Sequence, residues 1–313
     1  MGKLAFIFPG QGSQAVGMGK DLFDGFAEAR AVFEAVDAAL GEKLSTLCFE
    51  GPEEQQRLTA NTQPCILAVS AAAAAVLAGQ GLLPDLVAGH SLGEYSALVA
   101  VGAITAAEAA RAVRARGRFM QEAVPPGEGA MSAVIGLAPA QVAEICAAVA
   151  VEIGKPVSPA NYNEPGQTVI AGSAAAVEAA GVRLKAAGAK RVLPLPVSAP
   201  FHSELMTPVR ARLEPVLRAI AFRTPACPVV TNVEARPNAD PARMVPLLVE
   251  QVTAPVRWTE CVQELARQGV TRLVEVGPKN VLSGLVRRID RSLEVWNVED
   301  RDSLQRTLTA LRG

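Results

Sequence analysis

The sequence predicts an α/β protein whose mostly parallel sheet carries a small inserted subdomain. Short apolar runs bounded by Pro or Gly alternate with longer segments of helical periodicity, which is typical of a parallel sheet covered by helices. Past residue 127 the order changes to β-α-β-β-α-β, the pattern of ferredoxin-like units. We therefore expect a core made of residues 1–126 and 198–313, interrupted by a ferredoxin-like subdomain at residues 127–197.

The first half of the core begins with an apolar run that ends at a Pro-Gly turn. Strands are predicted at residues 4–8 and 86–89, and helices at residues 20–40, 63–80, 91–101 and 105–122. Pro64 suits the first turn of its helix, because proline has no N–H to donate there. Thr105 and Glu108 have the spacing of a capping box, which marks the start of a helix.

The subdomain and the second half of the core follow in the same way. In the subdomain, strands are predicted at residues 131–136, 156–161, 168–171 and 191–195, and helices at 139–150 and 174–187. Beyond it we expect helices at 204–219 and 281–288, one long helical region at 241–267, strands at 228–231, 272–276 and 293–298, and a last helix.

Composition limits the possible functions. Thirty basic residues against 31 acidic ones leave a net charge of −1, so a general affinity for nucleic acid is not expected. The most apolar stretch, residues 65–83, is Ala-rich and predicts a buried helix rather than a membrane span. Five scattered cysteines without a C-x-x-C pair indicate reduced thiols and a cytoplasmic protein. With only two histidines, a metal site is not expected.

The motif Gly-His-Ser-Leu-Gly at residues 89–93 lies between a predicted strand and a predicted helix. This context is typical of a nucleophile elbow, in which glycines permit a strained turn that exposes the serine hydroxyl. We therefore interpret Ser91 as a nucleophile and the core as α/β-hydrolase-like. The alternative is a purely structural strand-to-helix turn.

A serine nucleophile needs a base at neutral pH, and only two histidines are available. His90 adjoins Ser91, but an elbow points neighbouring side chains apart, so His90 is expected to pack beside the nucleophile. His202 lies in a loop just before a predicted helix, where catalytic groups often lie. We therefore assign His202 as the base.

Two backbone N–H groups are predicted to form an oxyanion hole. One belongs to Leu92, directly after the nucleophile, and the other to Gln11 in the glycine-rich turn after the first strand. A phosphate-binding loop is the competing interpretation of that turn. However, the turn lacks the Lys-Ser/Thr of a P-loop and the third glycine of a dinucleotide site.

Four arginines lie on the predicted helix at residues 105–122. Arg111, Arg114 and Arg118 share one face, whereas Arg116 lies off that face. An inward-facing Arg116 would need a carboxylate partner from the protein or from a substrate. The sequence leaves open the alternative that Arg116 is solvated.

Taken together, these residues resemble the malonyl-CoA:acyl carrier protein transacylases and the related acyltransferase domains of polyketide synthases. The shared motifs occur in the family's order over nearly the whole chain. They are G-Q-G-S-Q at 10–14, G-H-S-L-G-E-Y-S-A-L at 89–98, R-G-R-F-M-Q-E-A at 116–123, N-Y-N-E-P-G-Q at 161–167, F-H at 201–202 and Q-V-T-A-P-V-R-W at 251–258.

The resemblance implies a ping-pong transfer of malonyl from malonyl-CoA to acyl carrier protein through an ester on Ser91. His202 would be the base, oriented by the backbone carbonyl of Gln251 rather than by an acid. Arg116 would bind the free carboxylate of malonyl. Gln63, Met120 and Asn163 match positions near the substrate pocket, and Phe201 is the bulky residue typical of malonyl-selective members.

The resemblance implies no cofactor besides the coenzyme A thioester, which is a substrate, and we expect a monomer. Three other functions remain open from the sequence. The first is a serine hydrolase, although 111 residues follow His202, whereas such enzymes usually place histidine near the C-terminus. The second is a carrier-binding protein without activity. The third is an acyltransferase that serves a polyketide synthase or a malonate decarboxylase.

Overall fold

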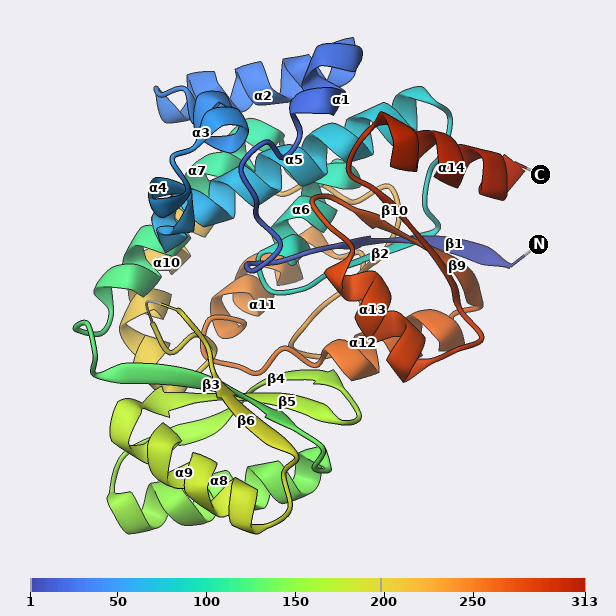
Figure 1. The fold of residues 1–313 in the computed structure, drawn as a ribbon. Helices are drawn as coiled ribbons and strands as arrows, with labels where there is room; N and C mark the ends of the chain where they lie inside the picture. The colour runs from blue at the N-terminus through green and yellow to red at the C-terminus, as the bar shows by residue number, and fades with distance from the viewer. Residues whose placement is uncertain (1, 198, 313) are drawn as a thin grey trace.

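The computed structural model describes residues 2–197 and 199–312, in which two sheets are present (Figure 1). The predicted boundary at residue 198 and the chain ends at residues 1 and 313 lie outside the described residues. The larger sheet has the order β10-β9-β1-β2-β7-β8. Its strands are β1 (Lys3–Phe8), β2 (Leu86–Gly89), β7 (Val229–Val230), β8 (Pro237–Asn238), β9 (Val270–Val276) and β10 (Glu294–Val298). All neighbours pair in parallel except β7 and β8.

Helices cover both faces of the larger sheet. Because side chains alternate along a strand, Leu4, Phe6 and Phe8 of β1 pack on one face, and Ala5 and Ile7 on the other. The first face is covered by α5 and α14, and the second by α12 and α13 (Figure 1). The core helices are α1 (Lys20–Gly25), α2 (Ala27–Leu40), α3 (Leu44–Glu50), α4 (Glu53–Arg57), α5 (Thr59–Gly79), α6 (Gly93–Ala100), α7 (Ala106–Glu122), α10 (Thr207–Arg218), α11 (Met244–Glu250), α12 (Trp258–Arg267), α13 (Val281–Ile289) and α14 (Arg301–Arg312), with 3-10 turns at Glu204–Met206 and Pro241–Arg243.

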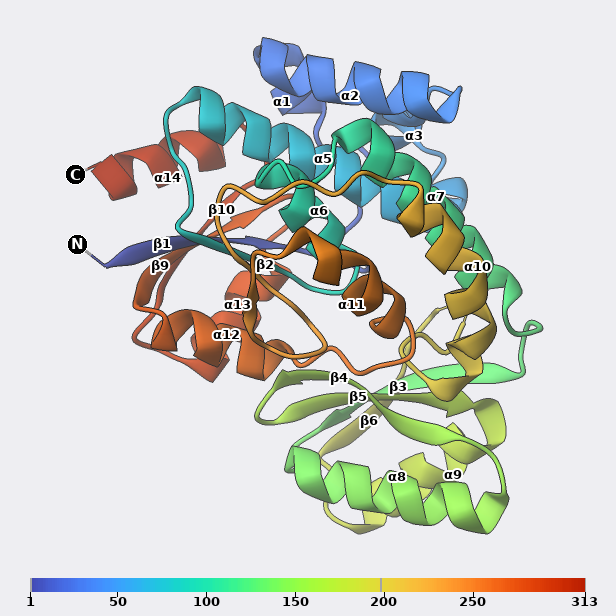
Figure 2. The same ribbon diagram turned by 180° about the vertical axis from the view of Figure 1, so that it is seen from behind.

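The smaller sheet is antiparallel and has the order β4-β5-β3-β6. Its elements occur along the chain in the predicted order: β3 (Gly129–Ile135), α8 (Pro139–Ile153), β4 (Val157–Glu164), β5 (Gln167–Ser173), α9 (Ala174–Ala186) and β6 (Arg191–Pro194). Helices α8 and α9 cover the outer face (Figure 2). The opposite face, which includes Met131 and Val169, packs against Phe201. The smaller sheet therefore forms one wall of the region around residue 201.

Helix α5 begins at Thr59, four residues before the predicted start. Pro64 accordingly lies inside the helix and not at its first turn. The helix is long and apolar enough to cross a membrane, but 83% of its apolar window is buried inside the structure. It is therefore the central core helix that the Ala-rich composition predicts.

The prediction of one helical region over residues 241–267 is wrong. Helix α11 ends at Glu250, α12 begins at Trp258, and the segment between them is not helical. Pro255 cannot donate a helical hydrogen bond and disfavours helical geometry in the residue before it. Residues 251–254 form turns, and the Val256 N–H then donates to Ala160 O (2.8 Å), so the edge of the smaller sheet holds the chain at Val256.

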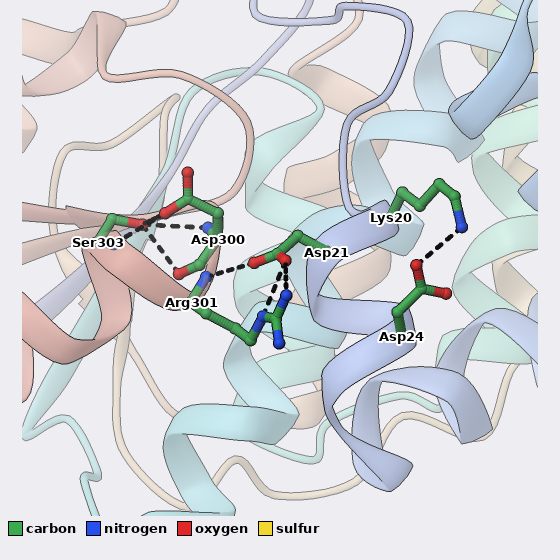
Figure 3. Close-up of polar contacts among 6 residues, drawn as sticks. All are labelled: Lys20, Asp21, Asp24, Asp300, Arg301 and Ser303. Carbon is green, nitrogen blue, oxygen red and sulfur yellow. Dashed lines mark hydrogen bonds and ion pairs between the residues drawn. The ribbon is translucent and has the colours of Figure 1, made fainter.

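The first and last helices of the chain meet at the surface (Figure 3). Asp21 of α1 accepts hydrogen bonds from the backbone N–H and the guanidinium of Arg301, both at 2.8 Å. Asp300 caps the start of α14 by accepting from the Ser303 N–H (2.8 Å). Lys20 and Asp24 form a separate, exposed pair on α1.

Candidate active site

Ser91 occupies a strained turn between β2 and α6. Its φ of 52° lies in the left-handed region, which costs a non-glycine residue on the order of 1–3 kcal/mol. A Cβ on Gly89 would lie 1.9 Å from the backbone of Gly93, and a Cβ on Gly93 would lie 2.0 Å from Phe8 O. Both glycines of the motif are therefore required by close backbone contact. The turn sets Ser91 beside the N-terminus of α6, where the helix dipole is positive.

Ser91 and His202 are in direct contact, although 111 residues separate them in the chain. Ser91 Oγ lies 2.7 Å from His202 Nε2. On the other side of the ring, Nδ1 lies 2.8 Å from Gln251 O and 3.2 Å from Ala254 O. Because carbonyl oxygens only accept, Nδ1 carries the proton and Nε2 of the neutral ring accepts from the serine. The non-helical segment after α11 supplies both carbonyls.

Burial controls the charge of His202. Desolvation, and secondly the positive charge of Arg116, lower the pKa of His202 from 6.5 to about 3. The ring is therefore neutral at physiological pH and able to accept a proton. In the same region, burial also lowers the pKa of His90.

Arg116 points into the protein and is 2% exposed. Its Nη1 donates to Gln63 Oε1 (2.8 Å), and its Nη2 donates to Gln251 Oε1 (2.9 Å) and Ser91 Oγ (3.1 Å). Its Nε is buried and has no hydrogen-bond partner among the described residues. Arg118, two residues later on α7, is exposed instead.

Two residues that sequence reasoning missed, Glu94 and Asn232, lie behind Ser91. Asn232 is fully buried, and its amide bonds the backbone of Gly89 and Ser91. Glu94 Oε2 accepts from the Asn232 N–H and from Gln251 Nε2, both at 3.0 Å. Desolvation raises the pKa of Glu94 to about 7. One signal for Asn232 was available: it follows a predicted parallel strand, at the sheet edge where sites form.

The two predicted oxyanion donors lie in the same pocket as Ser91 and His202. Among the described residues, neither the N–H of Gln11 nor that of Leu92 donates to a protein acceptor. The Ser91 N–H, in contrast, is already used by Asn232. The two unused donors are therefore available to a substrate oxygen.

The other predicted substrate residues separate into two groups. Gln63, Met120 and Phe201 line the pocket with Ser91, together with Met131 and Val197 from the smaller sheet and the segment after it. Asn163 does not line this pocket. Its Oδ1 lies 2.8 Å from His90 Nε2, and it borders a second cavity on the far side of Gln11 and His90.

The described residues hold no group of three His, Cys, Asp or Glu side chains suited to a metal ion. A serine paired with histidine, unused N–H donors and a buried arginine in one pocket define a site for acyl chemistry on a substrate that carries a negative charge. This is the class to which the comparisons with known proteins also point.

A family model described as the acyl transferase domain matches residues 5–306. A malonyl CoA-acyl carrier protein transacylase of Bacillus subtilis (strain 168) is 45% identical over 312 residues, covering 100% of this chain and 98% of that protein. The protein of the same name in Escherichia coli (strain K12) is 49% identical over 290 residues, covering 92% and 93%.

Solved structures agree with these relatives. An acyl carrier protein S-malonyltransferase from Vibrio cholerae has a TM-score of 0.95 and 48% identity, covering 97% of this chain and 99% of that one. A malonyl-transacylase in complex with a type II PKS acyl-carrier protein has a TM-score of 0.95 and 47% identity, covering 98% and 99%. The chain belongs to the acyl transferase family and, within it, to the malonyl CoA-acyl carrier protein transacylases.

Proposed function

We propose that this protein transfers malonyl from malonyl-CoA to the phosphopantetheine thiol of acyl carrier protein, through an ester on Ser91, and so supplies fatty-acid elongation. The relatives and solved structures that carry the same activity in their names support this function. The finer steps rest on the geometry of the pocket.

The observation that carries the choice of malonyl is the buried guanidinium of Arg116. Its described hydrogen-bond partners are neutral oxygens of Gln63, Gln251 and Ser91, and its Nε is unpaired. A buried charge without a bonded counter-charge is unfavourable, and an arginine binds a carboxylate strongly through two parallel hydrogen bonds. The free carboxylate of malonyl supplies this partner, whereas acetyl does not.

In the first half-reaction, Ser91 Oγ attacks the thioester carbonyl carbon. The serine proton moves to His202 Nε2, the new C–O bond forms, and the N–H groups of Gln11 and Leu92 stabilise the oxyanion. Collapse breaks the C–S bond, and His202 returns the proton to the sulfur of coenzyme A. The carbonyls of Gln251 and Ala254 stabilise the imidazolium that forms between these steps.

The second half-reaction reverses the roles with a new thiol. His202 takes the proton of the carrier's phosphopantetheine thiol, the sulfur attacks the malonyl ester, and Ser91 leaves with the proton. Gln63 holds Arg116, while Met120 and Phe201 fill the space beside the acyl chain. Asn163 acts indirectly, by holding His90 behind the nucleophile.

A second candidate function keeps the chemistry and changes the pathway. The structure of a related transacylase bound to a type II PKS acyl-carrier protein favours it, because that protein shares 47% identity with this chain. Transfer rates to carrier proteins of both pathways, measured side by side, distinguish the two functions.

Several further proposals accompany this function. The chain acts as a monomer in the cytoplasm and uses no cofactor besides the coenzyme A thioester. Residues 127–197 form a ferredoxin-like subdomain, which the β-α-β-β-α-β order and the β4-β5-β3-β6 sheet support, and the remaining core is α/β-hydrolase-like. Light scattering tests the oligomeric state.

The test of the function is the intact-protein mass after brief mixing with malonyl-CoA, with Ser91→Ala as the control. A malonyl adduct is expected on the wild type alone, followed by transfer to added acyl carrier protein. His202→Ala is expected to lower the acylation rate by about 10²–10⁴-fold. Release of free malonate without transfer would favour a hydrolase. An unmodified protein with intact malonyl-CoA would favour a carrier-binding protein without activity.

A further inference from the structure

Asn232 makes an unusual set of contacts, because it bonds both sides of the turn that carries Ser91. Its Nδ2 donates to Gly89 O (2.6 Å), and its Oδ1 accepts from the Ser91 N–H (2.7 Å). A carbonyl only accepts and an N–H only donates, so the orientation of the Asn232 amide is determined. The side chain thus bridges the residue that ends β2 and the serine two positions later.

Neighbouring strands bring this side chain to the turn. β2 and β7 pair in parallel, with Ala88 opposite Val230, so the carboxyl ends of both strands lie at one edge of the sheet. Asn232 follows β7 as Ser91 follows β2. Its own backbone N–H is held by Glu94, the residue after the last glycine of the elbow motif.

Ser91 needs such a restraint. Its φ of 52° persists only if surrounding contacts hold it, and a relaxed turn would move Oγ away from His202 Nε2. Asn232 is not one of the residues that line the pocket, and among the described residues no hydrogen bond joins it to His202. Its shortest side-chain contacts are with the elbow that carries Ser91, and its contact with Gln251 Nε2 is longer (3.4 Å), so any effect on catalysis is indirect and acts mainly through the placement of Ser91.

We propose that Asn232 is a positioning residue that holds the backbone of Ser91 in its strained, reactive conformation. This inference rests on the proposed function for its role in acyl transfer, but its test does not depend on malonyl. Because a displacement of about 1 Å can lower a rate by about 10²-fold, we expect a loss of this order when the side chain is removed.

The test measures Ser91 reactivity with an alkyl fluorophosphonate. In that reaction Oγ bonds to phosphorus, fluoride leaves, and His202 takes the proton. Asn232→Ala is expected to slow phosphonylation and malonyl acylation by a similar factor. On a Ser91→Ala background, the same change is expected to leave the Kd for malonyl-CoA unaltered, because the pocket is intact.

Asn238→Ala is the matched control. Asn238 is also buried, belongs to the same hairpin, and donates to Asp240 O (3.2 Å) without touching the elbow. It is expected to lower Tm but to leave Ser91 reactivity unchanged. If Asn238→Ala slowed phosphonylation as much as Asn232→Ala, the effect would be general destabilisation and the proposal would be overturned.

Asn232→Asp covers the case in which the alanine variant does not fold. Aspartate keeps the acceptor for the Ser91 N–H, but when ionised it cannot donate to Gly89 O, so slower phosphonylation is again expected. Phosphonylation at the wild-type rate in either folded variant would overturn the proposal. A wild type that reacts with fluorophosphonate but not with malonyl-CoA would contradict the proposed function alone.

Discussion

At the residue scale, both members of the reactive pair have an unusual backbone conformation, and the imidazole ring of His202 is neutral. Ser91 and His202 both have positive φ, 52° and 57°, which non-glycine residues rarely adopt. Such strain persists only where neighbouring contacts compensate for it. Here Asn232 and Gln251 bond the backbone of Ser91, and two carbonyls hold the ring of His202.

The pH dependence of acylation follows from burial of His202. Because its pKa is lowered from 6.5 to about 3, the ring remains a competent base well below pH 6.5. Rapid-quench measurement of the Ser91 adduct is expected to show a nearly constant rate until the pH approaches about 3, within the range where the protein stays folded. A rate that instead falls by about tenfold per pH unit just below pH 6.5 would contradict this assignment.

The lowered pKa of His202 also makes the stability of the folded protein depend on pH. The unfolded chain binds a proton on this histidine below pH 6.5, whereas the folded protein does so only near pH 3. His202 therefore lowers the free energy of unfolding progressively as the pH falls from 6.5 to about 3.

Arg116 determines selectivity in the proposed mechanism. Arg116→Ala is expected to lower kcat/KM for malonyl-CoA by on the order of 10²-fold or more, and to lower it much less for acetyl-CoA. The reason is that only malonyl presents a carboxylate to the guanidinium. Arg118→Ala, an exposed change on the same helix, is the control. If Arg116→Ala lowered kcat/KM equally for malonyl-CoA and acetyl-CoA, Arg116 would not act by binding the carboxylate.

At the element scale, the backbones of β1, β2 and α6 are in close contact where they meet. The backbone of Gly93 passes so close to Phe8 O that no side chain fits between them. Elsewhere, ordinary local rules hold: Thr105 and Glu108 form the predicted capping box at the start of α7, with bonds of 3.1 and 2.8 Å. The capping box thus sets the residue at which α7, the helix that carries Arg116, begins.

Gly93→Ala is expected to separate β1 from α6. A Cβ 2.0 Å from a carbonyl oxygen forces the backbone to move, at a cost of about 1–3 kcal/mol or more. Thermal unfolding should show a clear drop in Tm, together with loss of the Ser91 adduct. Gly166→Ala is the control, because a Cβ there meets nothing within 4 Å. Similar Tm values for the two variants would refute this account of the elbow.

At the scale of the whole molecule, the last helix closes the core beside the first helix. Two kinds of contact hold it: buried leucines, among them Leu308 at 5% exposed, and the surface pair of Asp21 with Arg301 (Figure 3). Exposed pairs contribute little to stability, because water screens them. Apolar burial is therefore the larger contribution.

The relative contributions of the buried leucines and of the ion pair can be compared with one variant of each. Leu308→Ala is expected to lower the free energy of unfolding by about 2–5 kcal/mol, while Asp21→Asn should leave it nearly unchanged. Urea titration of both variants measures the difference. A larger loss for Asp21→Asn would mean that the ion pair, and not the leucine, holds the end of the chain.

The sequence by itself determined the features that depend on neighbouring residues. Alternation of strands and helices, the glycines around Ser91, the capping box and the order of motifs are all local, and they predict the larger sheet, the β-α-β-β-α-β insert and the elbow. Local rules suffice here because backbone propensity and side-chain periodicity act over a few residues.

Only the tertiary structure decided the contacts that make the site work. After α11 the chain forms turns and then pairs with the smaller sheet at Val256, and the carbonyls of Gln251 and Ala254 in these turns reach His202. Asn232 is hydrogen-bonded to Ser91 at a sequence separation of 141 residues, and Gln251 to Glu94 at a separation of 157. No periodicity encodes such pairs. They form because parallel strands collect their carboxyl ends at one edge, where buried polar groups must find partners.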